Sequence, residues 1–335
     1  MYQATATGVE KMHASKNQKT VWSLILAAGE GMRLNTVTRR ADGAHVPKQY
    51  YSFQGRQTLL EQTCTRQLAV SDPQHIVAVV AAHHREFWRD SRAGLPARNL
   101  VVQPRDRGTA MGLLIGLMHI VQRQPDAIVV VTPADHGIRD EAGWRKSLRQ
   151  LAESAAETGH VTLLGVEPQQ GGGDLGWIVP NICDEETLEG VAHFVEKPGT
   201  AGAEVLSQTD ALWSTFVLAG SARALLGLYA TTQPWLLHRA LTQFYRPDGW
   251  FPEQVAHLYM SLPNVDFSAG VLARAPARLR VLRSPAHGWS DLGTPERLLH
   301  FLGAHPVVRP VTERSARERI AAEITEPLQL DWATF

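Results

Sequence analysis

The chain has 335 residues, 44% of them hydrophobic, and its 33 Lys and Arg residues balance its 33 Asp and Glu residues. This size and apolar content predict one large folded core with an appendage. The zero net charge gives no support for a nucleic-acid or membrane partner. Two cysteines, Cys64 and Cys183, are too few for a disulfide framework, and we interpret them as buried, reduced thiols.

The first 20 residues carry basic charge but no apolar run, so they lack the central feature of a secretory signal. We interpret residues 1–20 as a disordered N-terminal tail, and we expect a cytoplasmic protein. No stretch of the sequence approaches the roughly 20 apolar residues of a membrane-spanning helix.

From residue 21 onward, short apolar runs alternate with segments of helical periodicity. We predict strands at 21–26, 76–81, 99–102, 127–131 and 161–166, and helices at 58–70, 84–92, 108–122 and 140–157. Asp140 is placed to cap the last of these helices. Apolar strands separated by helices are typical of parallel strands covered on both faces. The sequence therefore predicts an α/β fold with a Rossmann-like, doubly wound, mostly parallel sheet.

After about residue 170 the pattern loosens, and four shorter strands are predicted at 177–180, 191–195, 213–219 and 279–283. Thr294 followed by Pro295 is typical of a helix start, and this helix should run to about Leu302. We expect one folded unit over 21–302, with one part over about 21–168 and a smaller subregion over about 169–302. Residues 303–335 are polar and could form a tail, a terminal helix or a contact in a homo-oligomer.

Three loops that could carry chemistry each follow a predicted strand directly. They are residues 28–33 (AGEGMR), 103–110 (QPRDRGTA) and 132–136 (TPADH). In an open parallel sheet, ligands bind outside the carboxyl ends of the strands. We therefore expect the three loops to lie side by side at one edge of the sheet.

The loop over 28–33 has the composition of a phosphate-binding turn. Gly29 and Gly31 permit backbone angles that other residues resist, and they let amide groups approach phosphate oxygens. Arg33 adds a fork of hydrogen-bond donors. The loop is not a Walker loop, because no Gly-Lys-Ser/Thr follows, and it lacks the third glycine of a dinucleotide fingerprint. The alternative interpretation is a strand-to-helix turn with a surface arginine.

Asp135 ends an apolar strand, where a carboxylate is costly unless it is paired or bound to a metal ion. Mg²⁺ takes one or two carboxylates together with phosphate oxygens, so a second acid is expected. Asp291 is the best candidate, and its alternative interpretation is a turn that leads into the next helix.

Two lysines are weaker candidates. Pro47 fixes the backbone beside Lys48, which favours a positioned cation that could neutralise charge in phosphoryl chemistry. Glu196 and Lys197 follow a strand-like run, where the carboxylate could accept sugar hydroxyls and the lysine could hold a phosphate. Most lysines and most Glu-Lys pairs are solvated surface charges, which is the alternative for both segments.

Taken together, eight segments in order resemble the sugar-1-phosphate nucleotidyltransferase family. The matching blocks are LAAGEGMRL (26–34), PKQY (47–50), QPRDRGTA (103–110), TPADH (132–136), GWIVP (176–180), FVEKP (194–198), LWSTFVL (212–218) and GWSDLGTPE (288–296). Within the family, the PKQ, QPRDRGTA and GWSDLGT blocks are most similar to those of mannose-1-phosphate guanylyltransferases.

The resemblance implies that GTP and mannose 1-phosphate react to GDP-mannose and pyrophosphate, with in-line attack of the sugar phosphate on the α-phosphorus. The implied nucleotide-binding residues are Ala28, Gly29, Gly31, Arg33, Gln103, Gly108 and Thr109. The implied sugar-phosphate-binding residues are Gly176, Glu196, Lys197 and Ser214. The resemblance also implies that Asp135 and Asp291 hold Mg²⁺, and that Arg33, Lys48 and Asp135 are catalytic.

The sequence departs from the family pattern in four places. Met32 replaces a usual Thr, residues 35–38 replace a Trp-Pro-Leu-Ser stretch, Ala134 replaces a Ser, and Ser214 replaces an Asn. The change at Ser214 shortens a side chain that is expected to reach a sugar hydroxyl.

Three other functions remain open at this stage. A cytidylyltransferase of the isoprenoid pathway would share the L-A-A-G loop and Pro-Lys-Gln, but these enzymes are shorter and do not account for FVEKP or GWSDLGT. Another sugar nucleotidyltransferase could use UTP or dTTP. Met32 and Ser214 suggest a catalytically silent nucleotide-binding paralogue. Four retained residues argue against it, namely Arg33, Lys48, Asp135 and Asp291.

Overall fold

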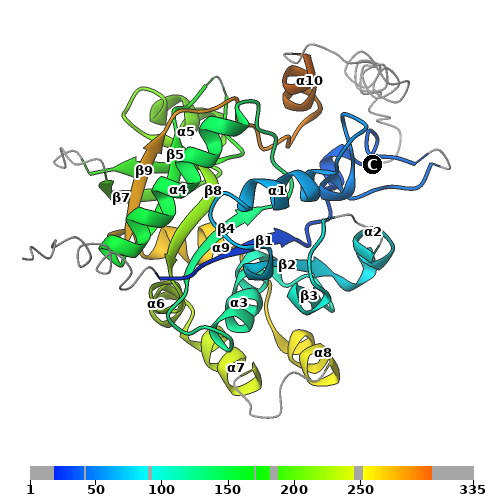
Figure 1. Ribbon diagram of the computed structural model, residues 1–335. Helices are drawn as coiled ribbons and strands as arrows, with labels where there is room; N and C mark the ends of the chain where they lie inside the picture. Colours follow the sequence, from blue (N-terminus) through cyan, green and yellow to red (C-terminus); the bar gives the residue numbers. More distant parts are fainter. Residues whose placement is uncertain are drawn as a thin grey trace, which may run out of the picture.

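A single mixed sheet organises the protein (Figure 1). The computed structural model describes residues 19–40, 43–89, 93–169, 171–181, 188–244 and 252–303. Within these residues the sheet has nine strands in the order β3-β2-β1-β4-β8-β5-β9-β7-β6. The strands are β1 (Val21–Ala27), β2 (Ile76–Ala81), β3 (Leu100–Gln103), β4 (Ile128–Pro133), β5 (Val161–Val166), β6 (Gly176–Pro180), β7 (Leu188–Glu196), β8 (Leu212–Ser221) and β9 (Leu279–Ser284).

The first four strands form a parallel half, as predicted. β1 pairs in parallel with β2 and β4, and β2 pairs in parallel with β3. Strand β2 is buried along its whole length, with Val79 facing one core and Val80 the other. Helix α3 (Gly108–Val121) packs on the first face, and α1 (Leu59–Gln67) and α4 (Glu141–Thr158) cover the second. The loops that follow β1, β3 and β4 therefore emerge at the same edge.

The remaining strands contradict the prediction of a mostly parallel sheet. β8 is antiparallel to both β4 and β5, and over the described residues the sheet has five antiparallel pairings and four parallel ones. Chain length explains part of the difference, because β6 ends at Pro180 and β7 begins at Leu188. A parallel crossover needs a dozen or more residues, so this connection permits only an antiparallel pair.

Several helices of the second half were not predicted. They are α5 (Gly199–Leu206), α6 (Ala222–Thr232), α7 (Pro234–Phe244), α8 (Pro252–Ser261) and α9 (Phe267–Gly270). Helices α6 and α7 pack beside α3 on the same face of the sheet. Helix α2 spans Arg85–Arg89, within the predicted helix at 84–92, of which residues 90–92 lie outside the described ranges. One hydrophobic core contains residues from Trp22 to Val281, so the two halves are packed together rather than separately.

Local sequence fixes the ends of the helices that position the site. Thr58 and Glu61 form a reciprocal capping box at the start of α1. Asp140 caps α4 as predicted, since its side chain accepts a hydrogen bond from the Gly143 amide at 2.9 Å. Helix α10 (Pro295–Gly303) begins after Thr294, whose hydroxyl accepts from the Arg297 amide.

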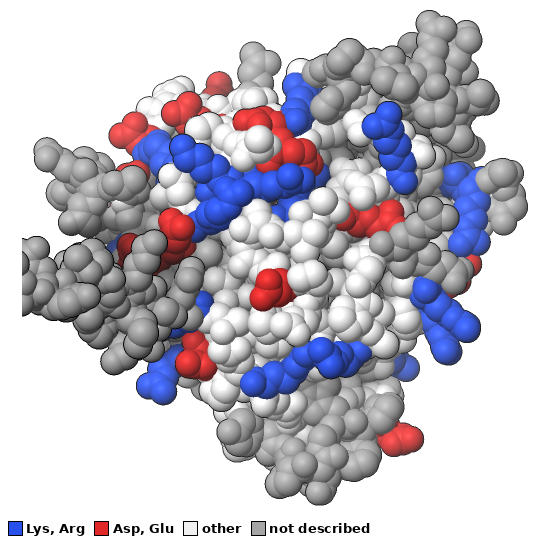
Figure 2. Space-filling model, viewed as in Figure 1, with Lys and Arg blue, Asp and Glu red and all other residues white. Residues whose placement is uncertain are grey.

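Some sequence predictions fall on residues outside the described ranges, namely most of the N-terminal tail, the segment after residue 303, and Cys183. Cys64 is a buried free thiol, as predicted, and burial raises its pKa to about 12. Among the described residues, no helix combines the length and apolar character that crossing a bilayer requires. Figure 2 shows positive and negative side chains interspersed over one face, in keeping with the balanced charge.

Candidate active site

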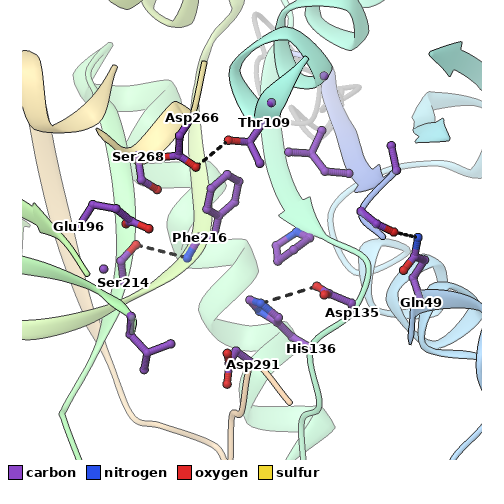
Figure 3. A pocket seen from close by; sticks show the side chains of 18 of the residues that line it. Gln49, Thr109, Asp135, His136, Glu196, Ser214, Phe216, Asp266, Ser268 and Asp291 are labelled. Carbon is purple, nitrogen blue, oxygen red and sulfur yellow. Dashed lines mark hydrogen bonds and ion pairs between the residues drawn. The ribbon is translucent and has the colours of Figure 1, made fainter. Parts of the chain in front are cut away.

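A pocket of about 510 Å³ opens where the carboxyl ends of β1, β3 and β4 meet the second half of the sheet (Figure 3). It gathers most of the residues predicted from the sequence. These are Ala28, Gly29, Arg33, Gln103, Gly108, Thr109, Asp135, Gly176, Glu196, Lys197, Ser214 and Asp291. The other two predicted residues, Gly31 and Lys48, lie directly behind this wall rather than on it, as their contacts show.

The two glycines of the first loop have different roles. Gly31 has φ +64°, and a Cβ placed there would lie 2.9 Å from the Lys48 amide nitrogen. Gly29 is outside the left-handed region, and a Cβ there would meet nothing within 4 Å. The prediction of unusual backbone angles is therefore right for Gly31 and wrong for Gly29. Gln49 supports the loop from behind, because its Nε2 donates to the carbonyls of Ala27 and Gly29 at 2.9 and 2.7 Å.

Lys48 joins the two acidic residues that the sequence singled out. Its side chain is only 7% exposed, and its Nζ lies 2.9 Å from Asp135 Oδ2. The same Nζ donates to the main-chain carbonyl of Asp291 at 2.6 Å. Lys48 is thus a buried, positioned cation rather than a solvated one. Residues 243 positions apart in the chain meet at this point.

The protonation states around Asp135 follow from burial and charge. Burial opposes ionisation of Asp135, but Lys48 and His136 outweigh it and hold its pKa below the ordinary value. Burial lowers the pKa of His136 to about 4, against the opposing charge of Asp135. Trp289 Nε1 donates to His136 Nδ1 at 3.1 Å, which places the imidazole proton on Nε2. At neutral pH the site therefore holds a carboxylate next to an ammonium group and an uncharged imidazole.

An ion-pair chain that the sequence did not predict runs along one side of the pocket. Asp174 Oδ2 lies 2.7 Å from Arg33 Nη1, and both Asp174 oxygens accept from the guanidinium of Arg297, at 2.9 and 2.5 Å. Arg297 Nε in turn lies 3.0 Å from Asp291 Oδ1. Burial opposes ionisation of Asp174, but the two arginines hold its pKa below the ordinary value. The predicted phosphate-binding arginine is therefore already paired with a carboxylate.

The second loop is held by a segment that was also missed. Gly108 has φ +78°, and a Cβ there would collide with Val265 O and Asn264 Oδ1. The Thr109 hydroxyl accepts from the Phe267 amide at 2.7 Å and lies 3.3 Å from Asp266 Oδ2. Thr109 thus anchors this segment, which brings Asn264, Asp266 and Ser268 into the pocket wall. No strand or helix periodicity marked them.

Glu196 and Ser214 lie on the side of the pocket opposite Thr109 and Asp135 (Figure 3). In the β6–β7 register Gly176 lies opposite Glu196, and a Cβ on Gly176 would lie 2.9 Å from Glu196 Oε2. Lys197 Nζ pairs with Glu196 Oε1 at 2.9 Å and is 58% exposed. Ser214 Oγ accepts from the Phe216 amide at 3.3 Å, in a turn where Phe216 has φ +58°. The glycine at 176 therefore leaves room for the Glu196 carboxylate in its present position.

Comparison with known proteins decides the family. Residues 22–304 match the family described as Nucleotidyl transferase. This chain belongs to that family. The resemblance inferred from the sequence blocks is thereby confirmed at the family level.

Individual relatives of this nucleotidyl transferase are distant. It is 25% identical over 285 residues to the xanthan biosynthesis protein XanB of Xanthomonas campestris pv. campestris, covering 83% of this chain and 59% of XanB. It is 27% identical over 296 residues to the mannose-1-phosphate guanylyltransferase ManC of Salmonella typhimurium, covering 83% of this chain and 58% of ManC. The chain thus spans a little over half the length of these curated relatives.

A solved structure shares the fold of this nucleotidyl transferase. The crystal structure described as mannose-1-phosphate geranyltransferase from Thermus thermophilus superposes with a TM-score of 0.73 at 25% identity. The match covers 86% of this chain and 80% of that protein. The mixed α/β arrangement therefore occurs in another protein of similar extent.

Proposed function

We propose that this nucleotidyl transferase transfers a guanylyl group from GTP to mannose 1-phosphate, giving GDP-mannose and pyrophosphate. The observation that carries the proposal is the position of Lys48, whose Nζ contacts Asp135 Oδ2 and the Asp291 carbonyl. These groups lie at a pocket that Glu196 and Ser214 close from the sugar-binding side. The choice of GTP and mannose 1-phosphate rests on the sequence blocks and on similarity to ManC.

In this proposal the loop over 28–33 holds the triphosphate. Gly29 leaves space for a close approach, since no atom lies within 4 Å of where its Cβ would be. Arg33 would bind phosphate oxygens in place of Asp174, its present partner. Lys48 would neutralise charge on the α-phosphate while the sugar phosphate attacks in line. Gln103, Gly108 and Thr109 would shape the base and ribose site, with Gln103 fixed by a hydrogen bond from Tyr259.

The acidic residues fit a magnesium ion, which the proposal requires. Asp135 and Asp291 both line the pocket. Asp291 Oδ1 is buried and, within the described part of the chain, has no hydrogen-bond partner, although Arg297 Nε lies 3.0 Å away. Two carboxylates beside a phosphate site are a donor set that Mg²⁺ accepts. When bound, the ion would neutralise charge on the phosphate oxygens.

At the other end of the pocket, Glu196 and Lys197 would bind the sugar and its phosphate. Gly176 leaves room for the Glu196 carboxylate, and the Lys197 side chain is 58% exposed, so its ammonium group could move from Glu196 to a phosphate. Ser214 already accepts a hydrogen bond from the Phe216 amide. Its hydroxyl therefore has a fixed position beside the proposed sugar site.

The test is pyrophosphate release from purified protein with Mg²⁺, each nucleoside triphosphate in turn, and a panel of sugar 1-phosphates together with methylerythritol phosphate. We expect the highest rate with GTP and mannose 1-phosphate, and loss of that rate in the Asp135→Asn variant. Release only with UTP or dTTP would reassign the base. Release with CTP and methylerythritol phosphate would favour the isoprenoid enzyme, and no release with any pair would leave the silent paralogue.

A further inference from the structure

A cluster of imidazole and carboxylate groups lies on the outer side of the first loop. Glu30 stands between Gly29 and Gly31, and His83 and His84 follow strand β2 directly. Because β1 and β2 are neighbouring parallel strands, the segments after them meet at one edge of the sheet (Figure 1). None of these three side chains, all of them among the described residues, lines the substrate pocket.

The geometry of the cluster suits a single cation. Glu30 Oε1 lies 2.7 Å from His83 Nε2, and Glu30 Oε2 lies 3.4 Å from His84 Nε2. One ligand atom from each residue lies within 4.8 Å of the other two. Donor atoms around a four-coordinate ion with bonds of about 2.0–2.1 Å lie roughly 3.4 Å apart. Small side-chain movements would therefore bring all three donors onto one ion.

The donor types select the class of ion. Two imidazole nitrogens with one carboxylate form a ligand set used by zinc sites that keep a fourth position open. Mg²⁺ prefers oxygen donors, so it suits Asp135 and Asp291 better than this cluster. The two sites would therefore differ in the metal that they bind.

Two buried imidazole nitrogens near this loop have no hydrogen-bond partner among the described residues. His84 is only 3% exposed, and its Nδ1 is buried with no hydrogen-bond partner within the described ranges. His45 Nε2 is in the same condition.

An ordinary ion pair explains less of this arrangement. One protonated imidazole would already neutralise Glu30, so an ion pair accounts for only one of the two rings, which lie 4.1 Å apart.

We propose that Glu30, His83 and His84 bind one transition-metal cation of the zinc class, distinct from the proposed magnesium site. Such an ion would tie the loop over 28–33 to the end of β2. The proposal does not depend on the reaction assigned to the pocket, and it is tested without substrate.

The experiment uses the full chain, stripped with a chelator and then titrated with Zn²⁺ by calorimetry and with Co²⁺ by visible absorption. We expect one equivalent of either ion to bind, with cobalt bands typical of four-coordination. An excess of Mg²⁺ should not displace it. Zn²⁺ should also raise the melting temperature, because it binds only the folded state.

Variants locate the site. His83 is half exposed, so His83→Gln should fold normally, yet it should weaken zinc binding at least about 100-fold, since even outer-shell changes cost 10–100-fold. Glu30→Gln should act similarly, and the matched control His193→Gln, at an exposed position on β7, should bind as the unchanged protein does. Failure of the unchanged protein to bind either ion would overturn the proposal. Binding that survives in His83→Gln would do the same, by placing the ion elsewhere.

Discussion

The two halves of the sheet differ in how directly their sequence dictates their structure. In the parallel half, β1, β2 and β4 are largely buried on both faces, the edge strand β3 exposes Val102, and each apolar run in the sequence became a strand. In the other half, β8 is inserted antiparallel between β4 and β5. An apolar run indicates that a strand is buried but carries no information on its direction. Strand positions are thus a local property, whereas their order and direction depend on the whole chain.

The halves also contribute differently to the pocket. The first half supplies Lys48 and Asp135, and the second supplies Asp174, Asp291 and Arg297, which pair with residues of the first half or with one another. The pocket therefore lies at the boundary between the two halves, and ion pairs cross this boundary.

The largest effect is expected at the shared acidic pair. Asp135→Asn should lower the rate of pyrophosphate release by about 10³-fold, because a metal clamp contributes several kcal/mol and each factor of ten corresponds to about 1.4 kcal/mol. Asp291→Asn should cause a comparable loss from the other half. If both carboxylates hold one ion, the double variant should lose little more than either single variant.

Asp140→Asn is the matched control, because asparagine caps helices as well as aspartate does and Asp140 lies outside the pocket lining. It should leave the rate unchanged. Near-normal turnover of Asp135→Asn would remove this residue from the metal site. If the rate losses of the two single variants multiply in the double variant, the two carboxylates act independently and do not hold one ion.

The next effect concerns stability at the Gly108 contact. Gly108→Ala should lower the free energy of unfolding by about 3 kcal/mol, because alanine at positive φ costs about 1–2 kcal/mol and the clash adds more. The alanine Cβ would strike Val265 O and Asn264 Oδ1 in the second half. Urea denaturation measures the change.

Gly227→Ala should instead stabilise the protein, because this glycine lies within one half and makes no close contact with the other. Gly227 lies inside helix α6, and a Cβ there would meet nothing within 4 Å. The change should stabilise the protein by about 0.5–1 kcal/mol, because alanine is the better helix former. If Gly108→Ala left the free energy of unfolding unchanged, the loops would not depend on the close contact at Gly108.

The free energy of unfolding should depend on pH through His136, which accepts a hydrogen bond from Trp289 across the boundary between the two halves. The unfolded imidazole takes up a proton near pH 6.5, but the folded one does so only near pH 4. Between these values the unfolded state binds more protons, so stability falls as the pH is lowered. The loss between pH 7 and pH 5 should be about 2 kcal/mol.

Urea denaturation of the unchanged protein and of His136→Asn at both pH values isolates this contribution. Asparagine can still accept from Trp289 but does not titrate. The variant should therefore lose about 2 kcal/mol less than the unchanged protein over the same interval. Equal losses in both proteins would mean that His136 is not held neutral.

Sequence reasoning predicted the pocket better than it predicted the contacts inside it. The rule that ligands bind at the carboxyl ends of parallel strands placed Gly29, Gln103 and Asp135 together. Asp174 was missed because a lone acid after a run of glycines has no periodicity. Arg297 was missed because a charged residue in a short helix is typical of a solvated face. Their ion pair spans 123 positions in the chain, so it becomes visible only when the order of the strands is known.

The smallest effect should come from Asp174, the carboxylate that pairs with the arginines of both halves. Asp174→Asn removes the negative charge that a triphosphate must replace at Arg33. The KM for nucleotide should fall by about two- to fivefold with little change in kcat, because partly exposed ion pairs contribute about 0.2–1 kcal/mol. The effect should shrink as salt is added, since both the pair and its competitor are screened. Asp210→Asn, at an exposed position away from the pocket lining, is the control. An increase in KM instead would mean that Asp174 holds Arg33 in its binding position. The Asp174 carboxylate would then support nucleotide binding rather than compete with the triphosphate for Arg33.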